Sequence, residues 1–257
     1  MGSAIDITLA ILTIIVPLFG GAFTVIMFYI RDVMEREPWI LVAKTFLWGL
    51  LTGLFLIGFS IPLFMGAKRV TDNMTSDWSI ILFMLAIVFI QAIFEETIKG
   101  LMLWRRCFIT MEEIDGLFDG FFYGATIGTG AGVVDAIAYA ILSTTWLQGF
   151  EIALIRTIRI PGTHALFTGL VGAYFTRHKF MEKKITPGVI TAILLHTIWS
   201  IVTYLFHYYF IGLSFYGANF AFLIIYLVLM SVISSSLVRY DRKHFPEIQN
   251  DIKSSNR

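Results

Sequence analysis

The segment "GLFDGFFYGATIGTGAGVVDAIAY", residues 116–139, is the most informative part of the chain about its architecture. It is long and apolar enough for a helix that crosses a bilayer. Its glycines recur at four-residue spacing, at positions 116, 120, 124, 128 and 132. Residues four apart lie on one face of an α-helix, so these glycines form a bare stripe along it. The stripe predicts that the backbone of a neighbouring helix approaches this segment closely.

The whole chain has the composition of a membrane protein. Of its 257 residues 57% are apolar and 24 are phenylalanine, against 19 Lys and Arg and 18 Asp and Glu. The net charge of +1, without a basic patch, argues against nucleic acid as a partner. The single cysteine, Cys107, excludes an internal disulfide and any zinc motif built from paired cysteines.

Apolar segments of membrane-crossing length recur along the chain. They predict an all-α, polytopic transmembrane helix bundle with about seven spans, at residues 7–30, 39–65, 79–104, 117–143, 160–176, 187–208 and 214–238. We expect one domain over residues 1–240, followed by a polar tail over residues 241–257.

The basic residues predict how the bundle is oriented. Most of the 19 Lys and Arg residues fall in the loops after the first, third and fifth predicted spans and in the tail. The loops on the other side carry only Lys68, Arg69, Arg156 and Arg159. Because loops rich in Lys and Arg stay in the cytoplasm, we expect the N-terminus outside the cell and the tail in the cytoplasm. The expected location is the plasma membrane.

The stretch "FEETIKG", residues 94–100, places three charges inside the third predicted span. On a helix, Lys99 can pair with either Glu95 or Glu96, which precede it by four and three residues. It cannot neutralise both, so one glutamate is expected to have no partner on its own helix. Polar contacts between helices are one interpretation. Two carboxylates at membrane depth are costly, however, and favour a functional site.

Further titratable residues occur in the next three predicted spans: Asp135, His164 and His196. Counted at about 1.5 Å per residue, Glu95 and His196 lie near the bilayer midplane, and Asp135 and His164 lie nearer the outer surface. These four side chains are therefore predicted to line one cavity in the middle to outer half of the membrane. The other histidines are expected at the surface, at positions 178, 207 and 244.

Several motifs follow one another in a distinctive order, at residues 28–49 ("FYIRDVMEREPWILVAKTFLWG"), 95–99 ("EETIK"), 119–139 ("DGFFYGATIGTGAGVVDAIAY"), 156–175 ("RTIRIPGTHALFTGLVGAYF") and 194–200 ("LLHTIWS"). This combination resembles the PrsW family of intramembrane proteases, distant relatives of the type II CAAX prenyl endopeptidases. The resemblance covers roughly residues 28–205. It implies a prokaryotic membrane protein with a protease-like core.

The resemblance also implies a set of site residues. The catalytic set would be Glu95, Glu96, Asp135, His164 and His196, and the supporting residues would be Lys99, Arg156 and Ser200. Two positions depart from the family pattern. Asp135 and Ala136 stand where the family usually has a Glu-Asn pair, and Ser200 stands where an asparagine is usual.

The implied reaction is hydrolysis of a peptide bond inside the membrane. Glu95 would take a proton from the attacking water, and the histidines would donate hydrogen bonds to the developing oxyanion. In a competing version His164, His196 and Glu95 hold Zn²⁺, because two imidazoles and a carboxylate form a known catalytic zinc set. The chain has no HExxH motif, and we favour the metal-free version slightly.

The implied substrate is another single-span protein in the same lipid bilayer, such as a membrane-anchored anti-sigma factor cleaved on its extracytoplasmic side. Two other functions remain open. A proton-coupled transporter would use the intramembrane Glu, Asp and His residues as an ion path, although they occupy four consecutive spans rather than mirrored positions. An inactive relative that binds membrane partners would explain the departures at Asp135 and Ser200.

Overall fold

The structure, a computed structural model, describes residues 4–31, 36–109, 114–209 and 213–244, apart from the side chains of residues 161 and 204–218. Within these ranges the chain forms only helices, in agreement with the predicted all-α class. They are α1 (Ala4–Arg31), α2 (Trp39–Thr71), α3 (Asp77–Leu103), the π-helical turn η1 (Trp104–Phe108), α4 (Leu117–Ile141), α5 (Trp146–Arg159), the π-helical turn η2 (Pro161–Ala165), α6 (Leu166–Met181), α7 (Thr186–Tyr209) and α8 (Leu213–His244).

The bundle is that of a multi-pass membrane protein. Among the described residues, 6 helices are long and apolar enough to cross a bilayer, namely α1, α2, α3, α4, α7 and α8. The outer helices carry many exposed large apolar side chains, for example Phe19, Phe55, Leu82 and Val228. An exposed apolar surface of this extent is favourable in lipid and unfavourable in water.

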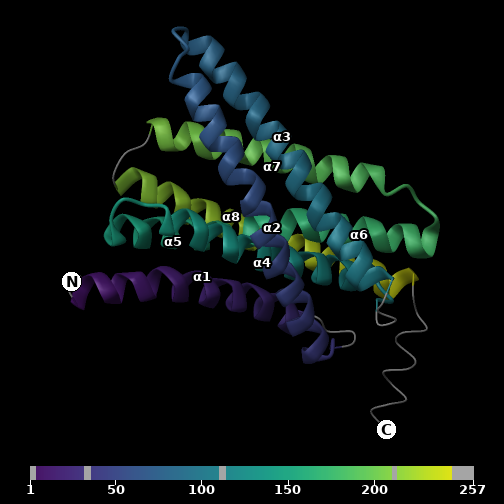
Figure 1. Cartoon of the computed structure of the whole chain (residues 1–257). Helices are drawn as coiled ribbons and strands as arrows, with labels where there is room; N and C mark the ends of the chain where they lie inside the picture. The colour runs from purple at the N-terminus through teal and green to yellow at the C-terminus, as the bar shows by residue number, and fades with distance from the viewer. Residues whose placement is uncertain (1–3, 32–35, 110–113, 210–212, 245–257) are drawn as a thin grey trace.

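Helix α4 lies at the centre of the bundle (Figure 1). Within an apolar stretch of 18 residues in α4, 67% of the residues are buried, whereas the corresponding share in the other membrane-crossing helices is 17 to 33%. A Cβ added at Gly128 would lie 1.9 Å from the carbonyl oxygen of His164, and one at Gly130 would lie 2.6 Å from that of Phe46. The glycines therefore admit the α5–η2–α6 segment on one face of α4 and α2 on the other. The predicted close approach is confirmed.

The fifth predicted span differs from the prediction at its start. Residues 146–159, expected as part of a loop, form α5, and the helical path continues through η2 into α6. The backbone stays right-handed helical at Ile160 and Leu166, so these elements make one broken helix. It runs antiparallel to α4, since its Arg156 meets Asp135 and its Gly172 lies against Gly120.

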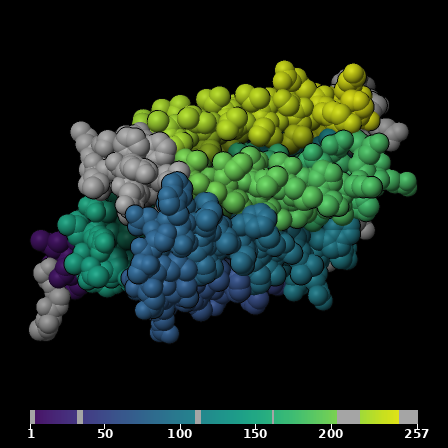
Figure 2. Space-filling view, turned by 90° about the horizontal axis from the view of Figure 1, so that it is seen from above, coloured from purple at the N-terminus to yellow at the C-terminus, as the bar shows by residue number. Residues whose placement is uncertain are grey.

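The remaining helices close the bundle around this pair. Helices α2 and α3 form a hairpin that crosses the others at a steep angle (Figure 1), and Phe59 of α2 stacks on Phe94 of α3 at 3.8 Å between ring centroids. Helix α7 packs on α3 and α6. On the face shown in Figure 2, α8 lies beside α7, and Trp199 of α7 contacts the rings of Phe222 and Tyr226.

Helix α8 extends beyond the predicted domain boundary at residue 240 and ends at His244. Asp241, predicted to belong to the tail, is buried. Its two carboxylate oxygens accept hydrogen bonds from the backbone amides of Leu117 and Phe118, at 3.0 and 2.8 Å. They satisfy amides that the first turn of α4 leaves unpaired. The remaining tail, residues 245–257, lies outside the described residues.

We expect Gly128→Ala to destabilise the protein and to impair its activity. The added methyl would lie 1.9 Å from the backbone oxygen of His164. This clash can be relieved only if η2 moves away from α4. Overpacking of this kind costs about 1–3 kcal/mol, and a displacement of about 1 Å at a site residue can lower a rate by about 10²-fold. Chemical unfolding in detergent and a cleavage assay measure the two effects.

Gly58→Ala is the matched control for this variant, because an added Cβ at Gly58 has nothing within 4 Å. It should be at least as stable as the unmodified protein, because alanine favours a helix more than glycine does, and it should react at the unmodified rate. If Gly128→Ala and Gly58→Ala had the same stability and the same cleavage rate, the close approach of α4 to η2 would not be needed for folding or activity.

Candidate active site

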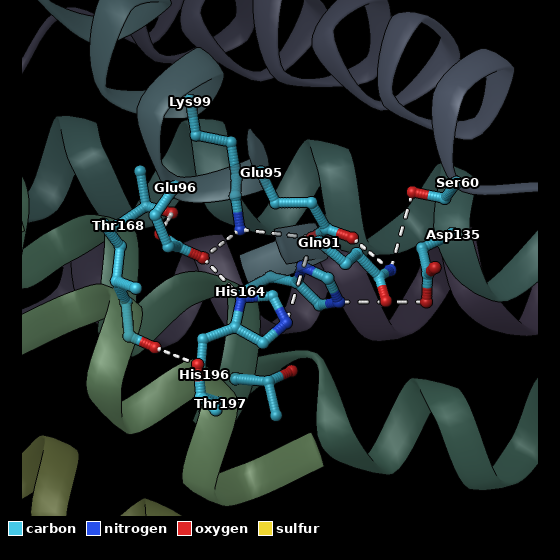
Figure 3. Close-up of polar contacts among 12 residues, drawn as sticks. Ser60, Gln91, Glu95, Glu96, Lys99, Asp135, His164, Thr168, His196 and Thr197 are labelled. Carbon is cyan, nitrogen blue, oxygen red and sulfur yellow. Dashed lines mark hydrogen bonds and ion pairs between the residues drawn. The ribbon is translucent and has the colours of Figure 1, made fainter. Parts of the chain in front are cut away.

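A cavity of about 430 Å³ lies between α2, α3, α4, α5, η2 and α7. Glu95, Asp135, His164 and His196, predicted to share one cavity, all line it. They come from four different elements, α3, α4, η2 and α7. Figure 3 shows the two imidazoles between the Glu96–Lys99 pair on one side and Asp135 on the other.

Glu96 lies behind the cavity and orients a histidine. Glu96 and Lys99 are both completely buried, and Nζ of Lys99 donates to Oε1 of Glu96 at 2.5 Å. The same oxygen accepts a hydrogen bond from Nδ1 of His196 at 2.8 Å, and Oε2 accepts one from Thr168 at 3.4 Å. With Nδ1 held by a carboxylate, the imidazole of His196 presents Nε2 to the cavity.

Glu95 is the carboxylate of the pair that lines the cavity. Its Oε1 accepts a hydrogen bond from Gln91 at 2.7 Å. Its Oε2 lies 3.7 Å from Nζ of Lys99 and 3.9 Å from Nε2 of His196. The prediction that one glutamate lacks a partner on its own helix is therefore wrong, because Gln91 lies one turn earlier and Lys99 contacts both carboxylates.

Asp135 and His164 occupy the opposite wall of the cavity. Asp135 forms an ion pair with Arg156, whose guanidinium stacks 3.6 Å from the ring centre of Tyr139. Nε2 of His164 lies 3.8 Å from Asp135, while its Nδ1 is buried without a hydrogen-bond partner among the described residues. The ring packs over Gly132, where a Cβ would come within 2.8 Å of it. The π-helical turn η2 sets this position, as such turns often do at functional sites.

The structure also places the remaining predicted residues. Ser200 and Arg156 line the cavity. His178 and His244 are exposed, as predicted, and the side chain of His207 lies outside the described part of the chain. Gln91, Tyr139 and Arg159, which were not among the predicted site residues, line the cavity too. Helical spacing could have indicated two of them, because Gln91 precedes Glu95 by one turn and Arg159 follows Arg156 on the same face.

The proposed zinc ligands do not converge in this arrangement. Among the described residues, no three His, Cys, Asp or Glu side chains are placed so that they could hold a metal ion. Each imidazole instead faces a different carboxylate, at 3.8 and 3.9 Å. Two ligand atoms of a tetrahedral zinc ion, at its usual bond lengths, lie only about 3.3 Å apart. The donor atoms suit zinc chemically, but in this arrangement the described side chains are not grouped closely enough to hold the ion together.

The comparisons with known proteins agree with the motif order. A family model described as PrsW family intramembrane metalloprotease matches residues 37–233. "Protease PrsW" of Geobacillus kaustophilus is 28% identical over 158 residues, 61% of this chain and 62% of that protein. "Protease PrsW" of Oceanobacillus iheyensis is 21% identical over 178 residues, 68% of this chain and 74% of that protein.

The chain thus spans less than two thirds of the length of the Geobacillus relative. No solved structure matches the chain significantly. The family model, however, covers well over half of the chain and includes Glu95, Asp135, His164 and His196. The chain therefore belongs to the PrsW family of intramembrane proteases.

Proposed function

We propose that this cavity hydrolyses a peptide bond of a membrane-anchored protein, with Glu95 as the general base. One observation carries the proposal. Oε2 of Glu95 and Nε2 of His196 face each other across 3.9 Å in the cavity, while Glu96 is buried behind them and fixes the other imidazole nitrogen. Two adjacent glutamates thus have two different tasks, of which only that of Glu95 involves the substrate.

A separation of 3.9 Å is too long for a direct hydrogen bond. It suits one water molecule that donates to both Glu95 and the unprotonated Nε2 of His196. We assign this tautomer of His196 because its Nδ1 donates to the Glu96 carboxylate. As the water oxygen attacks the scissile carbonyl, its proton passes to Glu95.

The later steps use the same groups. The carbonyl oxygen becomes an oxyanion, and an Nε2–H of His164 can donate a hydrogen bond to it from the opposite wall. When the C–N bond breaks, the protonated Glu95 returns the proton to the leaving amine. Glu95 is then a carboxylate again, and the two cleavage products dissociate. The carboxylate of Asp135, which is paired with Arg156, lies 3.8 Å from Nε2 of His164, and its negative charge favours the tautomer with the proton on that nitrogen.

The family description includes a metal, whereas no three donor side chains of the described residues are grouped so that they could hold one. No step of the proposed reaction is therefore assigned to a metal ion. Membership of a protease family favours hydrolysis over the proton-coupled transporter. An inactive relative would contain the same cavity and show no cleavage, so an activity assay separates it from the proposed enzyme.

We further propose that the cavity opens in the extracytoplasmic half of the membrane. Its lining residues come from the N-terminal half and the middle of α3, from the C-terminal half of α4, and from the middle and the C-terminal half of α7. Under the distribution of basic residues, these halves lie on the outer side. The natural substrate would be a single-span regulator, such as an anti-sigma factor, cut near the outer end of its span.

The test uses a reporter library of single-span proteins, each with a tagged extracytoplasmic segment joined to its span by a short randomised stretch. The purified full chain and the library are reconstituted together in liposomes, and the new termini are identified by mass spectrometry. We expect fragments whose termini cluster next to the span, and none from Glu95→Gln. Equal fragment release by both proteins would contradict the proposal.

A further inference from the structure

Arg159 is a positively charged residue that lines the cavity. It has no role in the proposed reaction. It is the last residue of α5, directly before η2, and it lines the cavity together with Arg156. Its Nε donates a hydrogen bond to the side-chain oxygen of Asn219 at 2.9 Å. This contact fixes the guanidinium through one nitrogen and leaves its two Nη groups for another acceptor.

The two other cations beside the cavity have carboxylate partners. Lys99 contacts Glu95 and Glu96, and Arg156 is paired with Asp135. Among the described residues, no carboxylate oxygen lies within 4.0 Å of the Arg159 guanidinium. A half-buried cation at membrane depth without a counter-ion is unfavourable and marks a site for an anion.

The geometry of a guanidinium suits one class of anion. Its fork of N–H groups binds a carboxylate through two parallel hydrogen bonds, at low cost in side-chain entropy. Glu95 contacts Lys99 and His196 and forms no ion pair with Arg159, so the Arg159 guanidinium is available to an anion other than the catalytic carboxylate. Trp199 and Thr203, which line the same cavity, are positioned to contact the rest of such a side chain.

We propose that Arg159 binds an Asp or Glu side chain of the protein substrate and so selects substrates with an acidic residue near the scissile bond. The selection rests on the proposed hydrolysis, but the binding does not require catalysis. It assigns to this chain a specificity subsite on the side of the cavity formed by α5 and α7.

Binding is measured first, on the Glu95→Gln protein in nanodiscs with the reporter library as the probe. The bound reporters are recovered and sequenced. We expect Asp and Glu to be enriched by about 10-fold or more at one position of the randomised stretch, since one hydrogen bond to a charged group contributes at least about an order of magnitude in affinity. The enrichment should disappear in Glu95→Gln/Arg159→Gln and persist in Glu95→Gln/Arg69→Gln, because Arg69 is exposed outside the cavity.

Cleavage is measured second, with otherwise unmodified protein. Arg159→Gln should raise the KM of the acidic reporters selected above by about 10-fold and leave their kcat nearly unchanged, as expected for loss of uniform binding. Reporters with Asn or Gln at the same position should be cut equally by both proteins.

The outcomes separate the two proposals. No acidic enrichment in the bound pool, or enrichment that survives Arg159→Gln, would overturn the assignment of Arg159. Co-purification of an anionic lipid that is lost only in Arg159→Gln would also overturn it, in favour of a lipid headgroup site. Acidic enrichment without cleavage by the unmodified chain would uphold the subsite and contradict the proposed hydrolysis.

Discussion

Glu95→Gln is expected to slow cleavage of the reporters by about 10²–10⁴-fold, the usual contribution of a general base. Glutamine has nearly the same shape as glutamate, and its side-chain oxygen can still accept the hydrogen bond from Gln91. It cannot take a proton from water. The loss should therefore appear in kcat under single-turnover conditions in liposomes, while binding of the reporters changes little.

Glu151→Gln is the matched control for this experiment, because Glu151 is an exposed carboxylate on α5, away from the cavity. It should cleave at the unmodified rate. Circular dichroism and unfolding of Glu95→Gln should match those of the unmodified chain, which separates lost chemistry from lost structure. Cleavage by Glu95→Gln at more than about a tenth of the normal rate would show that another group activates the water.

Lys99→Met is expected to be the most destabilising substitution in the bundle. Lys99 is completely buried between two carboxylates, at 2.5 Å from Glu96 and 3.7 Å from Glu95. Removal of one partner from a buried ion pair leaves an uncompensated charge and costs about 3–5 kcal/mol. Unfolding by a denaturing detergent, followed by circular dichroism, measures this loss.

A second variant identifies the cause. Lys99→Met/Glu96→Gln removes the cation and the carboxylate it contacts most closely, so it should regain much of the lost stability. Lys68→Met is the surface control, because the ion pair of Lys68 with Asp72 is exposed and contributes little. If the double variant is no more stable than Lys99→Met, the loss comes from packing rather than from unpaired charge.

The sequence predicted the parts of this structure that depend on strong local signals. The glycine spacing on either side of Gly128 predicted the close packing around α4, because only glycine allows backbones to approach so closely. The convergence of Glu95, Asp135, His164 and His196 followed from their depths along the spans. Depth is well determined by counting along a helix, since the rise per residue is constant.

Other features could not be predicted because they depend on contacts between distant residues. Helix α5 carries Gln148, Glu151 and Arg156, so a search for apolar spans passes over it, although packing against α1 and α4 stabilises it. The division of tasks between Glu95 and Glu96 depends on which face of α3 meets α7. That rotation is set by tertiary packing and leaves no periodic signal at two adjacent residues.

The departures from the family pattern have a partial structural explanation. Asp135, which stands where a glutamate is usual, still forms an ion pair with Arg156 and lies near His164 despite its shorter side chain. Ser200 lines the cavity, and nothing in the structure explains why serine replaces the usual asparagine there. The replacement of glutamate by aspartate at position 135 thus preserves the ion pair with Arg156 and the proximity to His164.

Cleavage after metal removal distinguishes a reaction that depends on Glu95 from one that depends on zinc. The purified chain is treated with a strong chelator, its zinc content is measured by elemental analysis, and the single-turnover rate is recorded before and after treatment. We predict that the rate stays unchanged when zinc is far below one ion per chain, because Glu95 alone activates the water. A rate that falls with the zinc content and returns when zinc is added back would show that the reaction needs the metal and would contradict water activation by Glu95 without it.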